Sequence, residues 1–385
     1  MKVLVVTPWL PTAGRPDIGV FIRRDIEMLR ADHDVEVIHL SADGQEATVD
    51  FPVTTVRMST ADPRSIRRAG GVIAERAGDA DLVHSMAASA LLPFLGRRIG
   101  RPWVHTEHWS ALLAPSTAPV SARVSLPLVR MLLRRPDVVI AVGHDLATAI
   151  GKTRRGRTRI IPNAVPRPVE VHARPDGGVL TLVGVGGLIA RKGPDIAVRT
   201  VAELRGRGED ARLLWAGDGP MRESVASLAK ELGVRDHVEL RGRVSPDEVE
   251  GLLAEADVFI LPTRMETFGV AIAEALVAGR PVVVSASGEQ ASFVSGPMAC
   301  WSKDGRPPTT PMPCSASRSS TATAPRRRSR RRRRPCSIPR SGATPRVRRI
   351  SRPPRRRQTR FPRTSTSSSP PTTPAGTSAA RSRPS

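Results

Sequence analysis

Residues 256–284 read ADVFILPTRMETFGVAIAEALVAGRPVVV, and this stretch decides the fold class. Val258–Leu261 and Val282–Val284 are short apolar runs of strand type, and an apolar run of helix length lies between them. Strand, loop, helix and strand in this order are typical of a parallel sheet whose two faces are covered by helices. The stretch therefore predicts an α/β protein.

The same alternation extends through the first 297 residues in two series. The expected strands are Val3–Val6, Val35–Leu40, Leu82–His84, Trp103–His105 and Val138–Val142 in the first series, and Val179–Val185, Arg212–Ala216, Val238–Leu240, Val258–Leu261 and Val282–Val284 in the second. The proline-rich residues 161–168 between them favour an extended linker. We expect two Rossmann-like, doubly wound domains, residues 1–165 and 166–297, with a ligand cleft between them.

The chain changes character after Pro297. Residues 298–385 hold 23 of the 60 Lys and Arg residues, one of the 36 Asp and Glu residues, and all three cysteines. They also contain 15 prolines and no apolar period, so we expect a disordered basic tail and an incomplete second domain. A genuine tail and an out-of-frame translation of GC-rich DNA both explain this composition.

Two carboxylates in the quoted stretch are the strongest candidates for ligand binding. Glu266 lies in the loop after the strand and Glu274 lies in the following helix, a separation that suits an extended sugar nucleotide. Amides of the first helical turn, from Thr267 through Phe268 and Gly269, would lie near phosphate. The alternative is that Glu266 caps the helix and Glu274 is merely solvated.

A second candidate site is the run VGVGGLIARKG at residues 183–193, where a strand enters a glycine turn. Gly186 and Gly187 permit a close approach of the backbone to phosphate, and Arg191 and Lys192 supply positive charge before a helix. A departing nucleoside diphosphate gains negative charge, which such a site stabilises without a metal.

These motifs resemble the retaining glycosyltransferases of the GT-B fold, family 4, with their E-x7-E motif. The resemblance implies that Glu266 contacts the donor sugar, that Glu274 binds the ribose, and that Lys192 binds the pyrophosphate. Gly187 stands where many members carry an arginine, so Arg191 is the remaining candidate for the second cation. Arg243 and Val244 resemble the loop near the donor base, although a simple strand-ending turn explains them equally well.

Two motifs in the first half also resemble this family. The stretch from Thr7 to Arg24 is similar to its opening strand and helix entry, with Gly19 beside the acceptor. The run VHTEHWS at residues 104–110 is similar to the segment that places a histidine near the reacting centre, which implies a catalytic role for His108. A structural histidine is the alternative. Residues 121–135 form a basic amphipathic pattern that fits either packing on the sheet or contact with an anionic membrane.

We therefore predict a metal-independent, retaining transfer of a hexosyl unit from a nucleotide sugar to a glycan, lipid or polyol, without a cofactor. The N-terminal sequence resembles neither a signal peptide nor a membrane span, so we expect a cytoplasmic protein with peripheral membrane contact at most. A sugar-nucleotide epimerase of the same fold is one alternative. The other is an inactive product whose tail binds nucleic acid through charge alone, without specificity, because aromatic stacking residues are scarce there.

Overall fold

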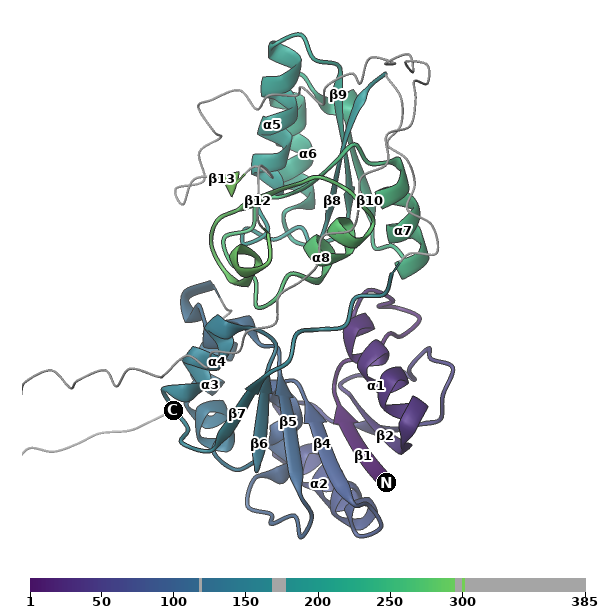
Figure 1. Cartoon of the computed structure of the whole chain (residues 1–385), viewed down its shortest axis with the longest axis vertical. Coiled ribbons are helices and arrows are strands. Elements are labelled where there is room, and N and C mark those ends of the chain that lie inside the picture. The colour runs from purple at the N-terminus through teal and green to yellow at the C-terminus, as the bar shows by residue number, and fades with distance from the viewer. Residues whose placement is uncertain (118–119, 168–177, 295–299, 302–385) are drawn as a thin grey trace, which may run out of the picture. The chain divides into compact units, whose positions relative to one another are not determined.

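The computed structural model describes residues 1–117, 120–167, 178–294 and 300–301, which lie in one compact unit of the chain and form two parallel sheets (Figure 1). The first sheet has the strand order β3-β2-β1-β4-β5-β6-β7 and the second the order β10-β9-β8-β11-β12-β13. In both sheets the chain starts at an inner strand, runs to one edge and returns to fill the other side. This is the doubly wound arrangement that the sequence predicts.

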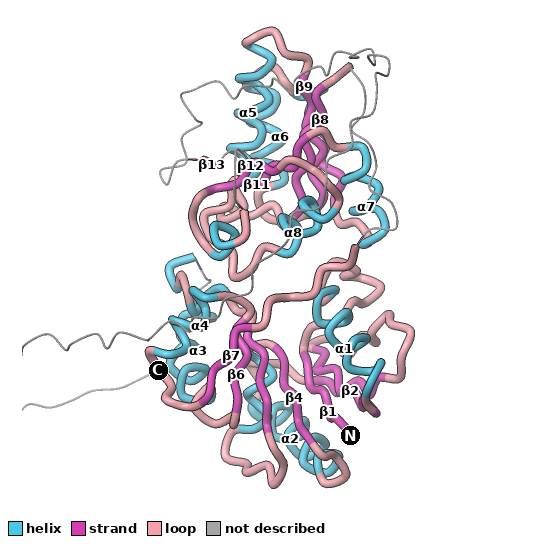
Figure 2. The backbone as a smooth tube through the Cα atoms, viewed as in Figure 1, coloured by secondary structure: helices cyan, strands magenta, loops and turns pink. Residues whose placement is uncertain are grey.

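Strands and helices alternate along the chain in both halves (Figure 2). The first sheet contains β1 (Lys2–Thr7), β2 (Asp34–Ser41), β3 (Val53–Arg57), β4 (Leu82–Met86), β5 (Trp103–Glu107), β6 (Val138–Ala141) and β7 (Arg157–Ile160). Its helices are α1 (Val20–Asp32), α2 (Pro63–Ala77), α3 (Val120–Leu132) and α4 (His144–Gly151), with short 3-10 turns at Ala88–Phe94, Ser110–Leu112 and Pro115–Thr117.

The second sheet contains β8 (Leu180–Val185), β9 (Ala211–Ala216), β10 (Val238–Gly242), β11 (Val258–Leu261), β12 (Val282–Ser285) and β13 (Cys300–Trp301). Its helices are α5 (Pro194–Gly206), α6 (Arg222–Glu231), α7 (Pro246–Glu255) and α8 (Val270–Val277), with 3-10 turns at Arg235–His237 and Glu289–Ser292. Ser245 and Glu248 form a capping box at the N-terminus of α7, which fixes where that helix begins.

The central strand β1 shows why its sequence is apolar without alternation. Val3 and Val5 pack with Ile22 and Ile26 of α1 on one face of the sheet. The intervening residues of β1 pack with α2 on the other face, so both faces are buried. Alternate side chains of a strand point to opposite faces, and a strand covered on both faces must therefore be apolar throughout.

Three short strands lie outside the predicted set. β3 and β7 are edge strands of the first sheet, and their half-exposed residues VTTVR and RTRI lack the apolar run of a central strand. β13 pairs with β12 beyond the predicted end of the second domain at Pro297. The remainder of the predicted tail, residues 302–385, lies outside the described residues.

Candidate active site

A cavity of about 410 Å³ is lined by loops that follow strands of both sheets. This volume falls within the usual range for a small-molecule site. Twelve of the thirteen predicted site residues line it, namely His108, Gly186, Gly187, Arg191, Lys192, Arg243, Val244, Glu266, Thr267, Phe268, Gly269 and Glu274. The structure thus brings together segments that lie up to 166 positions apart in the sequence.

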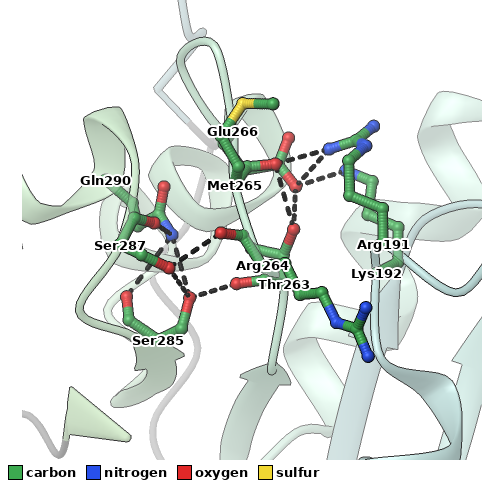
Figure 3. Close-up of polar contacts among 9 residues, drawn as sticks. All are labelled: Arg191, Lys192, Thr263, Arg264, Met265, Glu266, Ser285, Ser287 and Gln290. Atoms are coloured by element: carbon green, nitrogen blue, oxygen red, sulfur yellow. Dashed lines mark hydrogen bonds and ion pairs between the residues drawn. The ribbon is translucent and has the colours of Figure 1, made fainter. Parts of the chain in front are cut away.

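Glu266 is the centre of a compact polar cluster (Figure 3). Its Oε1 atom accepts hydrogen bonds from Lys192 Nζ at 2.7 Å and from the Thr263 hydroxyl at 2.7 Å. The Arg191 guanidinium lies 3.3 Å from the same oxygen and donates to the Met265 carbonyl at 2.6 Å. Both predicted phosphate cations therefore meet the predicted sugar-binding carboxylate.

The charge of this cluster is settled by its burial and its partners. Glu266 is only 6% exposed. Burial opposes ionisation of the carboxyl, but Lys192 and Arg191, together with the Thr263 hydroxyl, outweigh it and hold the pKa of Glu266 below its ordinary value. The site thus holds a carboxylate and two cations in contact at neutral pH.

A second loop braces the one that carries Glu266. Ser285 donates a hydrogen bond to the Thr263 carbonyl, and Ser287 donates to the Arg264 carbonyl at 2.8 Å. The fully buried Gln290 amide donates to the Ser285 hydroxyl at 3.2 Å and to the carbonyl of Ser287. The sequence offers no periodic signal for this brace, which joins small polar residues from β12 and the turn after it.

Glycines allow the two segments that are predicted to bind phosphate to pack against each other. Gly193, the N-cap of α5, has a φ of 68°, and a Cβ atom there would lie 2.5 Å from the Pro262 carbonyl oxygen. The loops that carry Lys192 and Glu266 are therefore in backbone contact. Gly269 caps α8 in the left-handed conformation, and the first amides of this helix face no carbonyl of their own helix. Their position on the cavity wall suits an anion.

Two further ion pairs cross the cavity. Glu274, the fifth residue of α8, accepts from Arg24 of α1 at 2.6 Å, and both side chains are less than one-fifth exposed. Arg243 donates to the two carboxylate oxygens of Asp17 at 2.8 and 2.9 Å. Arg24 and Asp17 stand in a stretch with a recognisable motif, but nothing in that motif indicates their partners in the second half.

His108 directly follows β5, and its ring packs on Phe21 with 4.8 Å between the ring centroids. The side chain is 6% exposed, and among the described residues neither ring nitrogen has a hydrogen-bond partner. Burial lowers the pKa of His108 to about 3, so the imidazole is neutral at physiological pH. A buried ring with two unpaired nitrogens on a cavity wall can donate one hydrogen bond and accept another.

Gly19 does not line the cavity. It has a φ of 72° at the N-cap of α1, and a Cβ atom there would lie 2.4 Å from the Trp9 carbonyl oxygen. Glycine is therefore required at this position, because any side chain would collide with the backbone of Trp9. The predicted contact of Gly19 with an acceptor stays a prediction.

Within the described ranges, no group of three or more His, Cys, Asp and Glu side chains could hold a metal ion.

Comparison with known proteins agrees with this fold. The family model for glycosyl transferases group 1 matches residues 180–304, and the model for glycosyltransferase family 4 matches residues 20–167. In structure, the chain is similar to HepE of Anabaena in complex with UDP and glucose, with a TM-score of 0.62 and 18% identity over 78% of this chain and 85% of that one. This likeness supports the fold.

Two curated relatives are similar in sequence. A 2-deoxystreptamine glucosyltransferase of Streptomyces kanamyceticus is 30% identical over 209 residues, 49% of this chain and 54% of the relative. A GDP-mannose-dependent alpha-(1-6)-phosphatidylinositol monomannoside mannosyltransferase of Mycobacterium tuberculosis is 34% identical over 190 residues, 42% of this chain and 48% of the relative. The match thus spans about half the length of these relatives. With two family models on successive parts of the chain and two doubly wound sheets around one cavity, this protein belongs to the group 1, family 4 glycosyltransferases of the GT-B fold.

Proposed function

We propose that the protein is a retaining glycosyltransferase that moves a hexosyl unit from a nucleotide sugar to a glycan, lipid or polyol acceptor. The observation that carries this proposal is the cluster of Lys192, Arg191 and Glu266 on the wall of a cavity that also holds the first amides of α8. Cations and helix amides suit a diphosphate, and a carboxylate suits sugar hydroxyls.

The reaction breaks the bond between the sugar C1 atom and the diphosphate oxygen. Lys192 and Arg191 stabilise the negative charge that gathers on the leaving diphosphate, without a metal or other cofactor. The acceptor oxygen bonds to C1 from the same face, and its proton passes to the leaving phosphate. Retention of configuration follows because attack and departure share that face.

Three other residues orient the donor in this proposal. Glu266 accepts hydrogen bonds from sugar hydroxyls, and Glu274 accepts from the ribose after it leaves Arg24. His108 supplies a neutral hydrogen-bond partner to the transferred sugar or the acceptor. An unpaired buried nitrogen costs about 1–3 kcal/mol, which a ligand hydroxyl would recover.

The full chain can be tested by incubating it with UDP-glucose or GDP-mannose and a panel of glycan, lipid and polyol acceptors. We expect release of nucleoside diphosphate and a product whose anomeric configuration, measured by NMR, matches that of the donor. An epimerase would return an altered sugar nucleotide without an acceptor product. No turnover with any donor, from a folded chain, would favour the inactive product.

The surface of α3 favours a lipid acceptor and peripheral contact with the inner face of a membrane as the finer form of this proposal. Val120, Val124 and Met131 are 72%, 75% and 48% exposed and share one face of the helix. Arg123 is exposed and Arg130 is half-exposed on the same helix. An apolar face with flanking arginines suits an anionic interface. No helix among the described residues is long and apolar enough to cross a membrane.

The arginines at the C-terminal end of the predicted basic segment, residues 121–135, are hydrogen-bonded within the protein and are not free to contact a membrane. Arg134 donates to the Thr153 carbonyl at 2.7 Å, and Arg135 donates to the Phe94 carbonyl. Flotation with vesicles that contain phosphatidylglycerol tests the exposed face. A Val124→Asp/Met131→Asp variant should lose binding that a Met28→Asp control, on an exposed part of α1, retains. Equal binding by both variants would reject contact through α3.

A further inference from the structure

A buried polar network lies directly behind His108 and is not used by the proposed chemistry. Glu107, the last residue of β5, is fully buried. Its Oε1 atom accepts from the backbone N–H groups of His108 and Trp109, both at 2.8 Å. Its Oε2 atom lies 3.3 Å from His105 Nε2. One carboxylate thus binds the two peptide groups that flank the His108 side chain.

The network continues away from the cavity and fixes the positions of its protons. Trp103 Nε1 lies 2.8 Å from Ser85 Oγ, and Ser85 Oγ lies 2.9 Å from His105 Nδ1. Indole nitrogen is only a donor, so Ser85 accepts from Trp103 and has its own proton to give to His105 Nδ1. A carboxylate is only an acceptor, so His105 Nε2 carries a proton that points at Glu107.

The environment of His108 explains why such anchoring matters. The ring is buried against Phe21, but neither of its nitrogens is held by another of the described residues. Its orientation therefore depends on ring packing and on the backbone to which it is attached. A carboxylate that clamps the peptide groups on both sides of the His108 Cα–C bond restrains that backbone.

We propose that Glu107 is a positioning residue, which holds the 107–109 turn so that the His108 ring faces the ligand, with Trp103, Ser85 and His105 orienting the carboxylate. The inference rests on the role proposed above for His108. Glu107 itself touches no ligand, because it acts through the backbone of the turn. Displacement of a reacting or orienting group by about 1 Å can cost roughly a hundredfold in rate.

Two substitutions separate positioning from simple stabilisation. Glu107→Ala removes every acceptor for the two amides, so kcat should fall roughly a hundredfold, with the KM for the donor changed by less than about threefold. Glu107→Gln keeps one oxygen for the amides, and it should restore kcat to within about tenfold of wild type. Its NH₂ group then faces His105, which must move its proton from Nε2 to Nδ1.

The control is Asp137→Asn, because Asp137 accepts the backbone N–H of Trp103 at 2.8 Å at the opposite end of β5. This variant should leave kcat and the ring tautomers unchanged. The Glu107→Gln/His108→Ala double variant should be no slower than His108→Ala alone, since two residues that act through one contact are not additive. If the losses in kcat of the two single variants multiply in the double variant, the inference is wrong.

NMR of the unliganded chain, with ¹⁵N-labelled histidine rings, gives a readout that does not require turnover. We expect His105 as the Nε2–H tautomer in wild type and as Nδ1–H in Glu107→Gln. In Glu107→Ala or Glu107→Gln, the ring-current shift that Phe21 imposes on His108 should change. If neither the His105 tautomer nor the His108 resonances move, Glu107 does not position the ring. Full activity of His108→Ala would instead refute the role proposed for His108.

Discussion

Replacement of Lys192 by alanine separates the proposed catalytic role of this cation from its structural role. Lys192 Nζ lies 2.7 Å from Glu266 Oε1, and the lysine side chain is 16% exposed. At an effective dielectric constant of about 20, two unit charges at that distance attract by roughly 6 kcal/mol, most of which offsets their desolvation. Because Arg191 and Thr263 still contact Glu266, we expect the free energy of unfolding to fall by only about 1–2 kcal/mol.

The effect on catalysis should be larger than the effect on stability. In the proposed reaction, the variant leaves the departing diphosphate with one cation in place of two, and removal of one such preorganised group typically costs about 100- to 1000-fold in kcat, or about 3–4 kcal/mol. Nucleoside diphosphate release, measured at saturating donor, gives kcat, and urea titration gives the free energy of unfolding.

Two further variants complete the experiment. Lys2→Ala is the matched control, because Lys2 also pairs with a glutamate, Glu36 at 3.5 Å, but lies away from the cavity. It should leave kcat unchanged. Lys192→Arg keeps the charge and should retain part of the activity. Wild-type kcat in Lys192→Ala, from a folded chain, would remove Lys192 from the mechanism.

Three other predictions concern ligand affinity, pH and backbone conformation. Arg24→Gln frees Glu274 from its ion pair, so the affinity for UDP or GDP, measured by calorimetry, should rise about threefold to tenfold. Weaker binding of both nucleotides would refute the idea that Arg24 competes with the ligand for Glu274. Burial lowers the pKa values of His84 and His108 to about 3 from 6.5, so between these two pH values only the unfolded state takes up the protons. Urea titration should therefore show the free energy of unfolding falling below pH 6.5, by about 3 kcal/mol from pH 8 to 5.5. A variant in which asparagine replaces both histidines should lose this part of the pH dependence. Gly19→Ala should lower the free energy of unfolding by about 2–4 kcal/mol in the same titration, because its Cβ atom would meet a backbone oxygen at 2.4 Å, and an unchanged midpoint would contradict this.

The central strands, and the two loops that line the cavity around Lys192 and Glu266, could be predicted from the sequence because their signals are local. The β1 run Val3–Val6 is apolar on both faces, and the glycine turn before Lys192 directly follows a strand. The edge strands β3 and β7 could not be predicted in this way. Their residues are half-exposed, so neither a continuous nor an alternating apolar pattern marks them.

The partners of the predicted site residues depend on contacts between distant segments. Arg24 and Glu274 are 250 positions apart, and each alone is compatible with a solvated surface residue. Gln290 is a polar residue in an irregular segment, yet it is fully buried and donates to Ser285 and Ser287, the two serines that hold the loop before Glu266. Composition and spacing identify the candidates, whereas the tertiary fold decides which of them neutralise one another.

The pairing of charges across the cavity has a consequence for the kinetics of encounter. Four cations on the wall, Arg24, Arg191, Lys192 and Arg243, are in contact with three carboxylates of the same wall. Seen from a distance, such a wall carries little net charge and exerts little attraction on an approaching dianion. The association rate constant of a nucleotide should therefore depend only weakly on ionic strength, and selection of the donor takes place after entry, when ion pairs within the protein are exchanged for contacts with the ligand.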